Sequence, residues 1–116
     1  MVTSIRDQIR ELLKEIWANN DMQPMEASDK LIKLSALLGN VGDRLVELER
    51  KFAQIKIQYM IDNPKMPISK IEILASDTDE YQELREVKEL QKSMVETIRS
   101  LKYFVRVREE EFRNVN

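Results

Sequence analysis

Apolar residues recur along this chain at the three- and four-residue spacing of amphipathic helices. In the segment 4–18 they are Ile5, Ile9, Leu12 and Ile16. This spacing places them on one face of a helix, and Thr3 or Ser4 offers a hydroxyl that can cap its first turn. A helix of about 15 residues is marginal alone. We therefore expect its apolar face to pack against a partner.

A much longer pattern predicts a second helix over about residues 24–62. Its apolar positions are Leu31, Leu34, Leu38, Val41, Leu45, Leu48, Phe52, Ile55 and Tyr59. The gaps alternate between three and four without a miss, which is a heptad seam typical of knobs-into-holes packing. Gly39 and Gly42 lie inside this pattern, and each costs about 1 kcal/mol relative to Ala within a helix. Either the helix bends or breaks there, or another backbone approaches closely; the unbroken phase favours a continuous helix.

Two prolines, Pro64 and Pro67, predict a linker over residues 63–69. Ser69 and Glu72 then have the spacing of a capping box, which predicts a short helix over about 70–76. The following run Asp77-Thr78-Asp79-Glu80 offers an N-cap for a last helix.

The last helix is predicted over about residues 79–113 and has a seam of its own. Leu84, Ile98, Val105 and Phe112 share one heptad position, and Val87, Met94 and Leu101 share its partner. Two seam positions are polar, Gln91 and Arg108. Polar seam residues lower stability and can fix register or oligomeric state.

These elements predict one all-α domain over residues 1–116. Segments 28–62 and 79–113 would form a long antiparallel helical hairpin with heptad seams, joined by the short N-terminal helix. Because two such seams cannot all be buried in so short a chain, we expect a homo-oligomeric helical bundle. The residues assigned to the core or oligomer seam are Leu31, Leu38, Leu45, Leu48, Phe52, Ile55, Leu84, Met94, Ile98, Leu101 and Val105.

Composition narrows the possible chemistry. The 116 residues include no Cys and no His, which excludes a disulfide framework and a Cys–His zinc site. The charged N-terminal segment is unlike a signal peptide, and no apolar run approaches a membrane span. We expect a cytoplasmic protein that is not an enzyme and has no cofactor or metal.

An acidic group lies where the last helix is predicted to begin. Its members are Asp77, Asp79, Glu80 and Glu83. They lack the spacing and the central glycine of an EF-hand loop. We interpret them as a helix cap or as a surface that attracts a basic patch on another subunit, rather than as a metal site.

A basic stripe on the last helix is the main candidate site. Its members are Arg85, Lys88, Lys92, Arg99, Lys102, Arg106 and Arg113, and Tyr103 lies among them. Segment 71–84 holds five acidic and no basic residues, whereas segment 85–113 holds eight basic and six acidic residues. A linear stripe of cations can follow a phosphate backbone, and an aromatic ring can stack on a base.

The alternative interpretation is a solvated helix flank in which the cations pair with glutamates. The pairs with suitable spacing are Arg85–Glu89, Lys92–Glu96 and Arg106–Glu110. Such pairs are common on exposed helices and imply no ligand.

The order of elements over about residues 45–113 resembles a known group of proteins. The features are Lys56-Ile57-Gln58-Tyr59, the Pro/Lys linker, Leu74-Ala75-Ser76-Asp77, Tyr81 and a helix that closes on residues 98–104. This layout resembles small phage-encoded helical proteins and is similar to the recombination mediator proteins of tailed phages. The resemblance implies a helical oligomer in the host cytoplasm that binds single-stranded DNA and helps to load a recombinase. It also implies that Lys65 and Lys70 add to the basic stripe.

A second hypothesis belongs to another class of protein. The chain would be a coiled-coil interaction module, an adaptor or inhibitor with no nucleic-acid binding. Its docking residues would be Ile5, Leu12, Leu13, Ile16 and Trp17. Such a module would place this apolar face in the groove of a partner.

Overall fold

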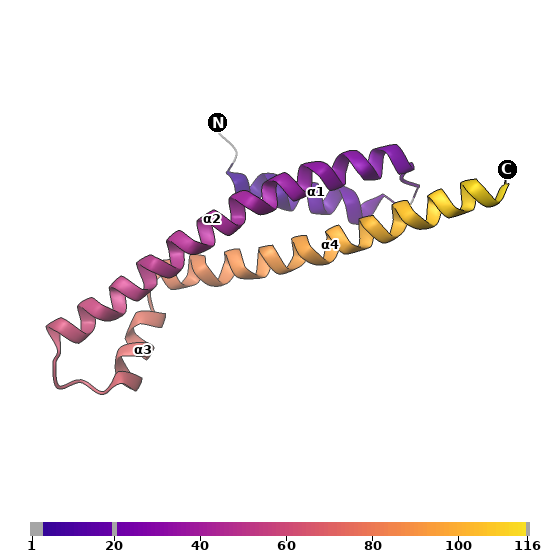
Figure 1. Ribbon diagram of the computed structural model, residues 1–116. Helices are drawn as coiled ribbons and strands as arrows, with labels where there is room; N and C mark the ends of the chain where they lie inside the picture. Colours follow the sequence, from indigo (N-terminus) through magenta and orange to yellow (C-terminus); the bar gives the residue numbers. More distant parts are fainter. Residues whose placement is uncertain (1–3, 20, 116) are drawn as a thin grey trace. The chain divides into compact units, whose positions relative to one another are not determined.

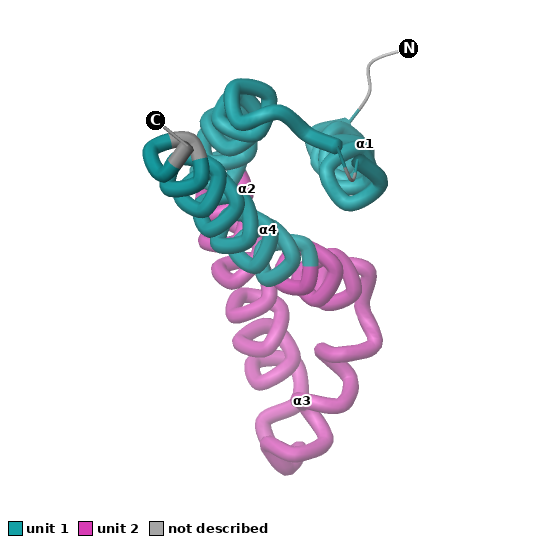
Figure 2. Tube along the Cα trace, turned by 90° about the vertical axis from the view of Figure 1, so that its right-hand side faces the viewer, with its two compact units in different colours: residues 1–40, 90–116 teal, residues 41–89 magenta. Residues whose placement is uncertain are grey.

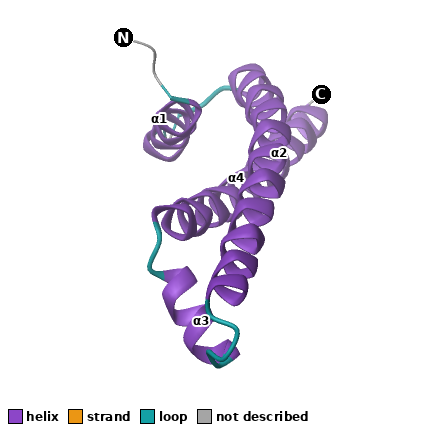
Figure 3. Cartoon of the chain, turned by 90° about the vertical axis from the view of Figure 1, so that its left-hand side faces the viewer, coloured by secondary structure: helices purple, strands orange, loops and turns teal. Residues whose placement is uncertain are grey.

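The computed structural model describes residues 4–19 and 21–115, and these residues form helices joined by short loops, with no strand (Figures 1 and 3). The helices are α1 (Ile5–Ala18), α2 (Pro24–Asp62), α3 (Ile68–Ser76) and α4 (Asp79–Val115). The all-α class predicted from the sequence is therefore confirmed. No described helix has an apolar stretch long enough to cross a membrane.

The two glycines do not interrupt α2, which is helical throughout Pro24–Asp62. The prediction of a continuous helix is confirmed. Within the described chain, a Cβ atom placed on Gly39 or Gly42 would meet no atom within 4 Å. No neighbouring backbone in this chain therefore requires a glycine at either position.

Helix starts follow the capping predictions in two of three cases. The Ser4 hydroxyl accepts a hydrogen bond from the Asp7 N–H at 3.1 Å, whereas Thr3 lies outside the described residues. At the start of α4, the Thr78 hydroxyl accepts one from the Tyr81 N–H at 3.3 Å. Both contacts satisfy donors that a helix leaves free in its first turn.

The capping box predicted at Ser69 is wrong. The helix α3 begins at Ile68, its N-cap is Pro67, and no side chain caps it. Proline restricts the residue before it and not the one after it, so helix can begin directly behind Pro67. The linker is accordingly shorter than predicted, and α4 continues past 113 to Val115.

The chain divides into two compact units (Figure 2). Unit 1 comprises residues 1–40 and 90–116, and unit 2 comprises residues 41–89. Both long helices contribute a segment to each unit, and the two segments run antiparallel within it (Figure 1). Unit 1 also contains α1, and unit 2 contains α3.

The core of unit 1 is formed by all three of its helical segments. Its buried residues are Ile9, Leu12, Ile16, Met22, Ala27, Leu34, Leu90, Met94, Thr97, Ile98 and Leu101. The apolar face of α1 is thus buried, as its short length requires. Polar contacts tie α1 to its neighbours: the Trp17 indole N–H donates to the Thr97 hydroxyl at 3.0 Å, and Lys30 pairs with Glu15 at 3.1 Å.

The core of unit 2 is smaller. Its buried residues are Val41, Leu45, Leu48, Ile71, Ala75, Leu84 and Val87. At its margin the rings of Phe52 and Tyr81 lie 5.1 Å apart between centroids. Here α3 supplies two buried side chains, Ile71 and Ala75, where α1 supplies three to unit 1.

The predicted seams form the inner faces of α2 and α4. Leu45, Leu48, Leu84, Met94, Ile98 and Leu101 are buried, and Leu31, Leu38, Phe52, Ile55 and Val105 are half-buried. The polar seam residue Gln91 is half-buried, and Arg108 is exposed. A single chain therefore already covers most of the surface that the sequence assigns to the core or to another copy.

Candidate nucleic-acid interface

Every member of the predicted basic stripe is exposed on α4. Arg85 and Lys88 belong to unit 2. The residues Lys92, Arg99, Lys102, Arg106 and Arg113 belong to unit 1 and are called the basic face below. At 1.5 Å per residue the basic face extends over about 30 Å of helix.

The helical repeat explains why the basic face points to solvent. Successive residues are turned by about 100°, so Lys92, Arg99 and Arg106 follow one another along one side of α4. Met94 and Leu101 lie roughly on the other side, where they are buried in the core of unit 1. Burial of the apolar side thus fixes the direction of the cations.

The glutamate pairs expected for a solvated flank do not form. Within the described part of the chain, neither Glu96 nor Glu110 lies within ion-pair distance of the cation four residues before it, and the same holds for Glu89. Lys88 instead lies 3.9 Å from the carboxylate of Glu49 on α2. The exposed ammonium and guanidinium groups of the basic face are consequently open to solvent anions.

An aromatic ring lies among these cations. Tyr103 is 61% exposed, and the guanidinium carbon of Arg106 lies 5.7 Å from the centre of its ring. Phe104 follows Tyr103 in the chain, and the guanidinium carbon of Arg108 lies 5.3 Å from the centre of the Phe104 ring. A ring with a guanidinium beside it can stack on a base while the cation contacts a phosphate.

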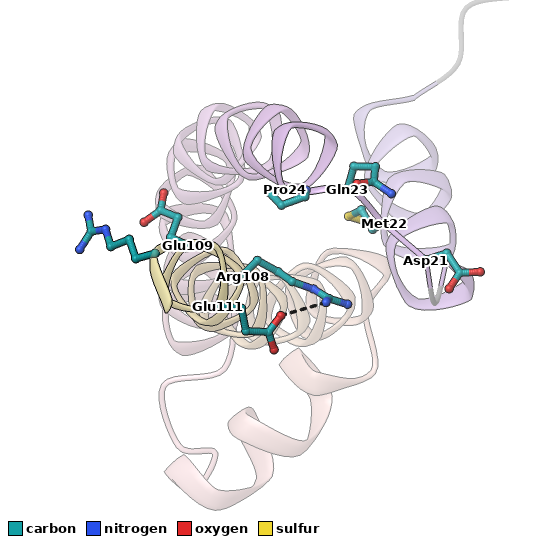
Figure 4. A pocket seen from close by; sticks show the side chains of 8 residues that line it. Asp21, Met22, Gln23, Pro24, Arg108, Glu109 and Glu111 are labelled. Atoms are coloured by element: carbon teal, nitrogen blue, oxygen red, sulfur yellow. Dashed lines mark hydrogen bonds and ion pairs between the residues drawn. The ribbon is translucent and has the colours of Figure 1, made fainter. Parts of the chain in front are cut away.

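A hollow of about 830 Å³ lies in unit 1 between the α1–α2 connection and the end of α4. It is lined by Asp21, Met22, Gln23, Pro24, Arg108, Glu109, Glu111 and Arg113. Figure 4 shows Arg108 extending from α4, with its guanidinium bonded to Glu111. Three carboxylates against two guanidinium groups make the hollow a poor site for an anion.

Unit 2 contains an ion-pair cluster that sequence reasoning missed. Arg44 on α2 donates from Nε to Glu83 Oε1 on α4 at 3.2 Å, and its Nη1 lies 3.1 Å from Glu47 Oε2. The hydrogen bond to Glu83 raises the pKa of Arg44, and the hydrogen bond from Arg44 lowers the pKa of Glu47. The sequence did contain a signal for this ion pair: Arg44 and Glu83 directly precede the seam residues Leu45 and Leu84, so each lies beside its seam.

Of the predicted acidic group, Asp79, Glu80 and Glu83 lie in the first turns of α4, and Asp77 is the C-cap of α3. Glu83 bonds Arg44, and the cap of α4 is the hydroxyl of Thr78. Among the residues that the structure describes, no three acidic side chains form a group that could hold a metal ion.

A buried row beside the α4 seam was also missed. Leu90 is 6% and Thr97 is 1% exposed, and they lie seven residues apart. The Thr97 hydroxyl donates to the Ser93 carbonyl at 2.8 Å and accepts from Trp17, so its burial leaves no polar atom unsatisfied. The spacing was visible in the sequence, but a threonine gives no apolar signal.

Comparison with known proteins adds no identification: no family model, curated protein or solved structure matches this chain.

Proposed function

We propose that this protein binds single-stranded DNA without sequence preference, as a homo-oligomeric accessory of phage-type recombination or replication. The observation that carries the proposal is the basic face of α4 in unit 1, with Tyr103 exposed beside it. Cations in a line neutralise phosphates, and stacking on a ring is tolerant of base identity.

Local charge favours an anionic ligand more than the total charge does. The whole chain has a formal net charge of −2. Between residues 92 and 108, however, the basic residues are Lys92, Arg99, Lys102, Arg106 and Arg108, and the acidic one is Glu96. A potential of this kind is felt over about a Debye length, near 10 Å at 0.1 M salt, so the local count governs the approach of a strand.

Four or five cations on one chain make weak binding by themselves. Several copies that engage one strand would gain affinity through effective concentration, which is why the proposal includes a homo-oligomer. A recombinase would then be the protein partner, and the acidic side chains of residues 77–83 are suited to a basic surface on it.

Charge reversal on the basic face is the most direct test. The variant Arg99→Glu/Arg106→Glu changes two exposed side chains, so its helix content should match that of the unmodified protein. We expect affinity for a labelled single strand of about 40 nucleotides to fall at least tenfold. The matched control is Lys14→Glu/Lys33→Glu, which makes the same charge change at exposed positions of α1 and α2.

The two variants together separate the possible outcomes. An equal loss of DNA affinity in both variants would indicate that binding depends on net charge alone. Unchanged affinity in the Arg99→Glu/Arg106→Glu variant would refute the assignment of DNA binding to the basic face. Tyr103→Ala should weaken single-strand binding more than duplex binding, because only unpaired bases can stack on the ring.

The interaction-module hypothesis has less support in the geometry. Leu12 and Ile16 are buried in unit 1, so two of its five docking residues are already covered. Ile5 and Trp17 remain exposed, at 49% and 62%. If the protein binds no DNA at low salt, these two side chains become the first to replace in a search for a protein partner.

A further inference from the structure

In unit 2 the helix α2 has a second apolar side that the chain does not cover. The outer row consists of Val46, Arg50, Ala53, Ile57 and Met60, which follow one another at gaps of four and three. All five are exposed, and Val46, Ile57 and Met60 are 60%, 54% and 44% exposed. These large apolar side chains are the opposite of what a solvated helix face usually presents.

The outer row lies opposite the inner seam of the same helix. At about 100° per residue its members fall within an arc of about 80°, and the buried Val41 and Leu48 lie about 140° and about 160° from the middle of that arc. A helix with apolar rows on two opposed sides is stable when it lies between two partners. Its spacing is that of a coiled-coil seam, so the fitting partner is another helix.

The charges beside the outer row identify which helix fits. Glu49 and Lys56 directly precede Arg50 and Ile57, so they lie on the same flank, seven residues apart. If a second α2 packs antiparallel with Ala53 near the twofold axis, Glu49 of each copy faces Lys56 of the other. In a parallel pair the same two residues would face Gln54 and Ile61, which carry no charge. The charges of this flank are therefore complementary to those of a second copy in the antiparallel orientation.

The existing contacts of this flank leave it free to pair. Glu49 lies 3.9 Å from Lys88, a distance at the limit of an ion pair, and both side chains are more than half exposed. Lys56 lies with its ammonium 4.6 Å from the ring centre of Phe52. At the centre of the row, the small Ala53 of one copy leaves room for the aliphatic stem of Arg50 from the other.

We propose that the outer row of α2 pairs antiparallel with the outer row of a second copy of this chain. The proposal gives a surface to the homo-oligomer of the proposed function, but it does not depend on DNA binding. The basic face belongs to α4 in unit 1, so the two proposals can fail separately.

Sedimentation equilibrium of the unmodified protein and of Ile57→Glu tests the surface. Each dimer would lose two isoleucine contacts and gain two carboxylates, each opposite Glu49 of the other copy, and we expect the dissociation constant to rise about 100-fold. Ile5→Glu, at a half-exposed position of α1, is the matched control and should leave the constant within about threefold. A chain that is monomeric at every concentration, or an oligomer that Ile57→Glu leaves intact, overturns the proposal.

Charge exchange tests the partner and its direction. Glu49→Lys or Lys56→Glu alone should raise the dissociation constant several-fold, since each creates two like-charge contacts across the twofold axis. The double variant Glu49→Lys/Lys56→Glu should restore it, because the pairs form again with their signs exchanged. Failure of the double variant to recover, with helix content unchanged, would refute antiparallel self-pairing.

Cross-linking gives an independent answer, because the chain has no cysteine of its own. The antiparallel arrangement brings Val46 of one copy near Met60 of the other and Ala53 near Ala53. An oxidised mixture of Val46→Cys and Met60→Cys proteins should therefore yield the mixed disulfide dimer, and Ala53→Cys should cross-link to itself. Efficient self-cross-linking of Val46→Cys would instead indicate a parallel pair and contradict the proposal.

Discussion

Units 1 and 2 are built from segments of the same two helices, but they expose different chemistry. In unit 1 the uncovered side of α4 carries the basic face, whereas in unit 2 the uncovered side of α2 carries the apolar outer row. Both surfaces lie on the opposite side of a helix from a buried seam. The comparison teaches that the seam determines how the chain packs, and that the side away from the seam determines what it can bind.

The third helix of each unit accounts for part of this difference. The 14-residue α1 is strongly one-sided, and it presents Ile9, Leu12 and Ile16 to the core of unit 1. The 9-residue α3 has apolar residues on more than one side: Ile71 is 3% exposed, while Ile68 and Ile73 are 63% and 70% exposed. In unit 2, α3 thus leaves apolar side chains in contact with water, and exposed apolar surface favours association.

The largest expected effect separates the two cores. Leu34 in unit 1 and Leu48 in unit 2 lie on the same helix and are both fully buried. Leu34→Ala or Leu48→Ala should each cost about 2–5 kcal/mol of unfolding free energy, because each leaves a cavity. Hydrogen exchange should show the larger loss of protection within the altered unit. Equal loss throughout the chain would contradict a division into two units.

A smaller effect is expected for the side-chain hydrogen bond between Trp17 and Thr97 in unit 1. Trp17→Phe removes the indole donor and Thr97→Val removes its acceptor, and each should cost about 1 kcal/mol. The double variant should cost less than the two losses together, since the second change removes a group that has already lost its partner. Circular dichroism during urea unfolding provides the free energies. Strict additivity would show that this hydrogen bond contributes nothing.

The glycines provide a stabilising change in each unit. Gly39 belongs to unit 1 and Gly42 to unit 2, and a Cβ atom at either meets nothing within 4 Å. Replacement of either by Ala should therefore raise the unfolding free energy by about 0.5–1 kcal/mol, through lower entropy of the unfolded chain. Thermal unfolding at low protein concentration measures the gain. If replacement of one glycine alone lowered the unfolding free energy, other atoms of the protein would have to lie close to that glycine and not to the other.

The smallest effect concerns pH and the ion-pair cluster of unit 2. Arg44 lowers the pKa of the Glu47 carboxyl below its usual 4.5 in the folded protein. The carboxylate therefore stabilises the fold above that pH, and this contribution is lost as the pH falls through the lowered pKa. Glu47→Gln should make the thermal midpoint less dependent on pH between about pH 5 and about pH 3. A Glu47→Gln variant whose thermal midpoint depends on pH as steeply as that of the unmodified protein would contradict this role of Arg44.

The sequence was sufficient to predict the helices and the inner faces of the long pair. An unbroken heptad phase outweighed the unfavourable propensity of Gly39 and Gly42, because packing of a long apolar seam exceeds about 1 kcal/mol per glycine. The predicted start of α3 was wrong. The capping pattern at Ser69 favours a later start, but a helix can begin directly after Pro67.

The tertiary contacts could not be predicted in the same way. The pairing of Arg44 with Glu83 depends on how two distant segments meet, and no local spacing encodes it. The same is true of Trp17 and Thr97, which are far apart in the chain. The basic stripe was predictable as a pattern, because a heptad row on a helix lies on one side whatever the helix packs against. Only the structure could establish that the stripe is exposed and that the expected glutamate pairs are absent from the described residues.

The central claim is that the basic face of α4 binds single strands by their phosphates, and salt dependence tests it most directly. Fluorescence anisotropy of a labelled strand of about 40 nucleotides would be measured with the unmodified protein at about 50 and about 200 mM salt. Four phosphate contacts per chain predict that the association constant is about 50-fold smaller at the higher salt concentration. Duplex DNA should bind more weakly than the single strand at both salt concentrations. An absence of binding at about 50 mM salt, where charges are screened least, would contradict the account.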